Sequence, residues 1–83
     1  MNSQKLKSRL KEMYLSANIG EKSMMIRLFG IIYAEEIKVE GVTPKELASS
    51  IENDNYHAEI SKGMKLAKYV TLKDDFKHLK VYI

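Results

Sequence analysis

The helix start at Thr43 constrains the fold of this chain more than any other feature of the sequence. Thr43 suits the N-cap position, and the chain's single proline, Pro44, follows it at the first helical position, where its missing N–H costs nothing. Glu46, three residues after Thr43, completes a capping-box pattern. The pattern predicts a helix that runs from about Thr43 to Glu52. Its apolar side consists of Leu47, Ala48 and Ile51.

A second helix is predicted from about Tyr56 to Lys68, after a run of turn residues, Asn53, Asp54 and Asn55. At 100° per residue, the side that faces the core spans about 80° of arc and carries Tyr56, Ile60, Met64 and Ala67. The opposite side carries Ala58, Ser61, Lys62 and Lys65, with Lys68 extending it and His57 at its border. Residues 43–69 therefore predict a helix-turn-helix, in which the first helix braces the second and the second enters the major groove of DNA.

Two further helices are predicted before this pair. The first spans about residues 3–17, with an apolar stripe made of Leu6, Leu10, Met13, Tyr14 and Ala17. The second spans about residues 21–38 and is apolar on nearly every side between Met24 and Tyr33. Such a helix is either central in its fold or buried by a partner, so helix 24–33 is also a candidate interface for a homodimer or a protein partner. Gly30, in its middle, indicates that another helix crosses closely there.

The end of the chain changes period. Apolar and polar residues alternate on both sides of the turn-like sequence Asp74–Lys77, which predicts a β-hairpin over about residues 69–83. The predicted fold is a single domain over residues 1–83, mainly α, with about four helices and a small C-terminal β-hairpin in a winged helix-turn-helix-like arrangement.

Composition excludes several classes of function. The chain has 83 residues and no cysteine, and it lacks the run of about 18 apolar residues that a membrane span needs. No apolar run follows the N-terminus, so we expect no signal peptide and a cytoplasmic protein. The acidic residues form no spaced catalytic pair, and there is neither a nucleophile elbow nor a glycine-rich phosphate loop. We therefore predict a protein that is not an enzyme, with no cofactor, no metal and no small-molecule substrate.

Positive charge is concentrated at the two ends of the chain. The net charge is +3, but residues 1–14 and 62–83 are both basic whereas residues 15–61 are acidic. If the two ends lie together in the fold, they form one positive face that suits a polyanionic partner such as DNA. The same lysines would also suit an ordinary solvated surface.

The region from about residue 43 to 83 resembles the winged helix-turn-helix superfamily, and it is similar to short bacterial and phage proteins described as helix-turn-helix-like. The likeness rests on the sequence Thr43–Ala48, the helix at 56–68 and the predicted hairpin. It implies a small DNA-binding module, such as a transcriptional or mobile-element regulator. The alternative is a winged-helix protein-interaction or adaptor module that does not bind DNA. The predicted DNA-binding residues are His57, Ser61, Lys62, Lys65, Lys68, Lys73, Lys77 and Lys80.

This sequence departs from the superfamily pattern in two places. The turn at residues 52–55 is longer than usual and has no glycine, and the helix at 56–68 contains Gly63 but no arginine. Because arginine to guanine is the commonest specific base contact, we expect contacts dominated by the DNA backbone.

Overall fold

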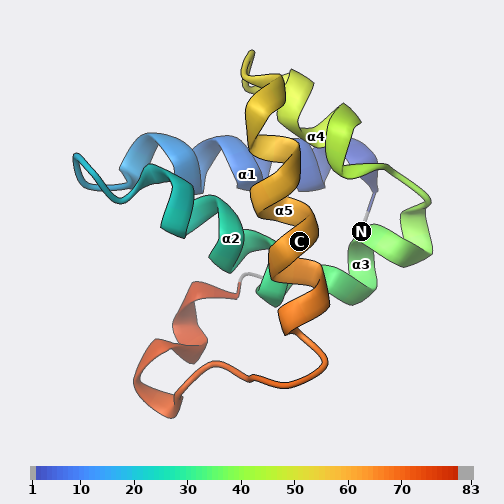
Figure 1. The fold of residues 1–83 in the computed structure, drawn as a ribbon. Coiled ribbons are helices and arrows are strands. Elements are labelled where there is room, and N and C mark those ends of the chain that lie inside the picture. The colour runs from blue at the N-terminus through green and yellow to red at the C-terminus, as the bar shows by residue number, and fades with distance from the viewer. Residues whose placement is uncertain (1, 81–83) are drawn as a thin grey trace.

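Helices account for all the regular secondary structure in residues 2–80, the part of the chain that the computed structural model describes (Figure 1). The elements in chain order are α1 (Ser3–Ser16), α2 (Lys22–Ile32), α3 (Ala34–Glu40), α4 (Pro44–Ser50), the 3₁₀ helix η1 (Asp54–Tyr56), α5 (His57–Leu66) and the 3₁₀ helix η2 (Asp74–Leu79). No helix in this range is long and apolar enough to cross a membrane.

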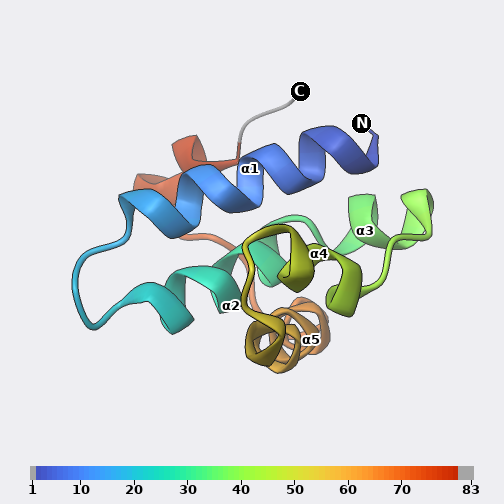
Figure 2. The same ribbon diagram turned by 90° about the horizontal axis from the view of Figure 1, so that it is seen from above.

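Helix α2 lies at the centre of the fold. Figure 2 shows α1 on one side of it and α5 on the other, and Figure 1 shows the same order from back to front. Its buried residues pack with apolar side chains from the surrounding helices, and the core consists mainly of Leu6, Leu10, Met13, Ile26, Phe29, Tyr33, Ile37, Leu47, Ala48 and Ile60. The nearly continuous apolar sequence of α2 therefore follows largely from its central position.

The helix predicted over residues 21–38 is broken at Tyr33. This residue has φ −109° and ψ 19°, so α2 ends before it and α3 begins after it. The Tyr33 side chain is fully buried, with its ring centroid 5.1 Å from that of Phe29. The break redirects the chain so that both Tyr33 and Ile37 reach the core. Because apolar residues occur on nearly every side of the predicted helix, their periodicity does not indicate where the helix ends.

The helix start at Thr43 is confirmed. The Thr43 hydroxyl oxygen accepts a hydrogen bond from the Glu46 backbone N–H at 3.1 Å, and the same hydroxyl donates to the Glu46 carboxylate at 3.3 Å. Helix α4 ends at Ser50, and Glu52 adopts φ 58° in the left-handed region that glycine usually occupies. Glu52 thus takes the place of the missing turn glycine. The 3₁₀ helix that follows, η1, leads directly into α5.

The predicted C-terminal β-hairpin is wrong, and with it the winged arrangement. Residues 69–80 contain no strand, and η2 occupies most of the second half of this segment. Leu72 and Leu79 are partly buried against the helical core, so these side chains are covered by helices rather than by a paired strand. An isolated hairpin would be unstable unless it packed on the helices. Here Leu72, in the loop, and Leu79, in η2, pack on the helices without forming a hairpin. Residues 81–83, the end of the predicted hairpin, lie outside the described residues.

Candidate nucleic-acid interface

Helix α5 is held against α2 at a crossing of two glycines. A Cβ atom built on Gly63 would overlap the backbone carbonyl oxygen of Arg27, and one built on Gly30 would overlap that of Ile60. The prediction that a helix crosses at Gly30 is confirmed. The crossing helix is α5 itself, which explains why a predicted recognition helix contains Gly63. Only two residues without side chains permit the backbones to approach this closely.

An ion pair and an apolar contact hold the same helix on its two flanks. The guanidinium of Arg27 on α2 donates from Nη2 and Nε to one carboxylate oxygen of Glu59, at 2.8 and 3.0 Å. On the side of α4, Leu47 and Ala48 are fully buried, as is Ile60 on α5. Helix α5 therefore has the fixed position that a recognition helix requires.

The outer side of α5 and the turn directly after it carry five of the eight predicted site residues. His57, Ser61 and Lys65 follow one another at intervals of four residues, which places them along one stripe of α5, and Lys68 lies in the turn directly after the helix. Lys62 lies beside this stripe. All five are exposed except Ser61, which is half-buried. The Lys62 ammonium lies 3.6 Å from the second Glu59 oxygen, so its charge is partly balanced within the protein.

The other three predicted residues are not brought to α5. Figure 1 shows the 74–79 segment at the lower edge of the fold, and Figure 2 shows it on the side of α2 opposite to α5. The ammonium of Lys77 pairs with Asp74 at 2.9 Å, and that of Lys80 pairs with Glu36 on α3 at 2.9 Å. Lys73 is exposed on the loop before η2. The wing that would have held these lysines beside the recognition helix is absent from residues 2–80.

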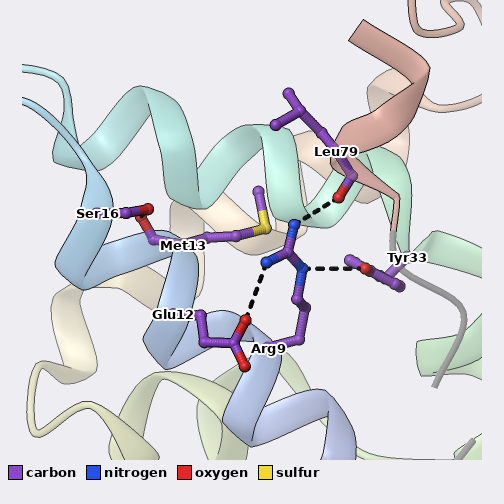
Figure 3. Close-up of polar contacts among 6 residues, drawn as sticks. All are labelled: Arg9, Glu12, Met13, Ser16, Tyr33 and Leu79. Atoms are coloured by element: carbon purple, nitrogen blue, oxygen red, sulfur yellow. Dashed lines mark hydrogen bonds and ion pairs between the residues drawn. The ribbon is translucent and has the colours of Figure 1, made fainter.

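The side chain that anchors this C-terminal segment is Arg9, which is not among the predicted site residues. Figure 3 shows its guanidinium between α1, α2 and η2. Nε donates to the Tyr33 hydroxyl at 3.2 Å, Nη1 to the Glu12 carboxylate at 3.1 Å, and Nη2 to the backbone carbonyl of Leu79. With only 12% of its side chain exposed, Arg9 is a structural residue. In the sequence it is one of several cations on α1, and nothing in their spacing distinguishes it.

The basic residues of α1 and those of α5 do not form one face. Helix α1, with Lys5, Lys7 and Lys11, lies across α2 from α5 in both views (Figures 1 and 2). The cations of α1 and those of α5 therefore lie on different sides of the domain.

Comparison with known proteins assigns the chain to a family. A family model described as an HTH-like domain matches residues 2–73, which include α1 to α5. The chain belongs to this HTH-like domain family. No curated protein and no solved structure gave a match. The match ends before η2, so the segment that Arg9 anchors lies beyond the matched region.

Proposed function

We propose that this HTH-like domain is a non-catalytic module that binds double-stranded DNA through the outer side of α5, as a regulator of transcription or of a mobile element. The observation that carries the proposal is the stripe of His57, Ser61 and Lys65, with Lys62 beside it, on a helix fixed by α2 and α4; Lys68 follows in the turn after the helix. A helix presented in this way fits the width of the major groove.

The chemistry of the stripe favours phosphate contacts over base reading. Three lysines supply mobile point charges for phosphate oxygens, whereas only Ser61 and His57 offer short polar groups to base edges. If all three lysines reach phosphates, the logarithm of the binding constant falls with the logarithm of the salt concentration with a slope of about −2.7. We therefore expect modest sequence preference and strong salt dependence.

Reversing two of these charges is expected to weaken DNA binding strongly. The double variant Lys62→Glu with Lys65→Glu replaces two attractive contacts by repulsive ones, so the dissociation constant should rise at least about tenfold and the salt slope should shrink by roughly two. Fluorescence anisotropy with a labelled duplex of mixed sequence, recorded over a series of salt concentrations, measures both quantities.

A matched variant on α1 separates the role of the site from the role of total charge. Lys5→Glu with Lys11→Glu causes the same change in net charge at exposed residues across α2 from α5. We expect it to retain most of the affinity of the parent. Equal losses in the two double variants would contradict a site on α5, and an absence of binding at low salt would contradict DNA binding altogether.

One observation favours the second candidate function, a protein-interaction module. The face of α2 that points away from α5 carries the exposed Met24 and the partly buried Met25, Leu28 and Ile31. If the domain binds no DNA, this face becomes the principal candidate for its function.

A further inference from the structure

An apolar groove runs along α2 where the C-terminal segment packs beside it. Its volume is about 550 Å³, and its apolar lining consists of Met24, Met25, Leu28, Ile31, Phe76 and Leu79. Met24 is 66% exposed and Phe76 is 51% exposed. Contiguous apolar surface of this kind on a small domain is typical of an interaction site.

We propose that a second copy of this chain docks on this groove, with the two α2 helices packed antiparallel about a two-fold axis at Met24. In a two-fold antiparallel pair, residues at equal distances before and after the axis face each other. With the axis at Met24, that residue meets its own counterpart. Glu21 and Arg27 lie three residues before and after it, so Glu21 of each copy faces Arg27 of the other.

The charges at the edge of the groove favour a second copy as the occupant. Glu21 and Arg27 both line the groove. In the antiparallel arrangement two copies of the chain form two Glu21–Arg27 pairs, so a partner of different sequence is not needed to balance these charges. Arg27 uses Nη2 and Nε toward Glu59, and a guanidinium has a further nitrogen with two N–H donors. The carboxylate of Glu21 accepts a hydrogen bond from the Asn18 side chain at 2.9 Å, which holds it at the start of α2.

The exposure of Ile19 supports the same arrangement. This residue lies in the loop before α2 and is 101% exposed, so none of the described residues of its own chain covers it. In an antiparallel pair, the loop before α2 of one copy lies over the C-terminal half of α2 of the other. Ile19 would then pack near Leu28 and Ile31, which line that half of the groove. This inference uses α2, the loop before it and the C-terminal segment, and it does not depend on DNA binding by α5.

Sedimentation equilibrium of the full chain tests whether a dimer forms through this groove. A groove of this size suggests an interface at the small end of the usual range, so the chain should be examined from about 10 µM to about 500 µM. We expect a reversible monomer–dimer equilibrium. Met24→Glu should raise the dimer dissociation constant at least about tenfold, because two like charges would face each other at the axis. Val39→Glu on α3, where the valine is 79% exposed, is the matched control and should leave the equilibrium unchanged.

A charge exchange between two variants tests the register. Glu21→Lys and Arg27→Glu should each weaken self-association, because each places like charges opposite one another. An equimolar mixture of the two should dimerise again, since both cross pairs are then of opposite sign. Circular dichroism checks that each variant is folded, because Arg27 also pairs with Glu59. A monomer at every concentration, a dimer that Met24→Glu leaves intact, or a mixture that stays monomeric would each overturn the proposal.

Discussion

Replacement of Gly63 by alanine is expected to lower the free energy of unfolding by about 3 kcal/mol or more, at the upper end of the cost of overpacking. The new methyl group would overlap the backbone carbonyl of Arg27, and no change of side-chain rotamer relieves contact with a backbone atom. The effect opposes helix propensity, which favours alanine over glycine by about 1 kcal/mol. A domain of 83 residues has a total stability of roughly 4–12 kcal/mol, so the loss is a large part of it. Urea unfolding followed by circular dichroism measures the change.

A control on the same helix and a partner on α2 make this test specific. Ser61→Ala introduces the same residue on the outer side of α5 and should change stability by less than about 0.5 kcal/mol. Gly30→Ala should be as damaging as Gly63→Ala, and the double variant should lose less than the sum, because both changes act on one crossing. A Gly63→Ala variant as stable as the parent would show that α2 and α5 do not approach at these glycines.

Removal of the Arg9 side chain is the second large effect that we expect. Arg9→Ala should lower the free energy of unfolding by about 2–3 kcal/mol, because the bonds to Tyr33 and Leu79 are charge-assisted and mostly buried. The loss should be greatest in the C-terminal segment, which Arg9 ties to α1. Urea unfolding gives the total effect, and hydrogen exchange of the amides in residues 74–80 gives the local one.

Two other variants on α1 show whether the geometry of Arg9 matters. Lys5→Ala removes an exposed cation from the same helix and should have little effect on stability. Arg9→Lys keeps the charge but cannot reproduce the planar fork that reaches three acceptors, so it should recover only part of the loss. Full recovery by lysine, or unchanged exchange in residues 74–80 of Arg9→Ala, would contradict the anchoring role.

The features that were predictable from the sequence are those governed by local chemistry. The cap at Thr43 depends on residues within one turn of one another, and it appears as expected. The close crossing at Gly30 follows from the cost of a mid-helix glycine, although the sequence does not identify Gly63 as its partner. The stripe on α5 follows from helical periodicity alone, so His57, Ser61 and the three lysines of that region lie together as expected.

The features that were not predictable depend on contacts between distant parts of the chain. The alternation of apolar and polar residues after Tyr69 involves only a few apolar side chains. Packing Leu72 and Leu79 against helices removes these side chains from water as well as a pair of strands would. The bond from Arg9 to the Leu79 carbonyl joins residues 70 positions apart, and no local pattern reports it. The positions of Lys73, Lys77 and Lys80 depend on where the chain runs after α5, so they change when η2 takes the place of the predicted hairpin.

The most direct test of the proposed function is an NMR titration of the full chain with a short DNA duplex at low salt. If α5 enters the groove, the amide signals of residues 57–68 should shift most. Those of α1 and of residues 74–80 should remain close to their positions in the free protein. Shifts centred on α1 or on the exposed face of α2, or no shifts at any duplex concentration, would contradict a DNA-binding site on α5.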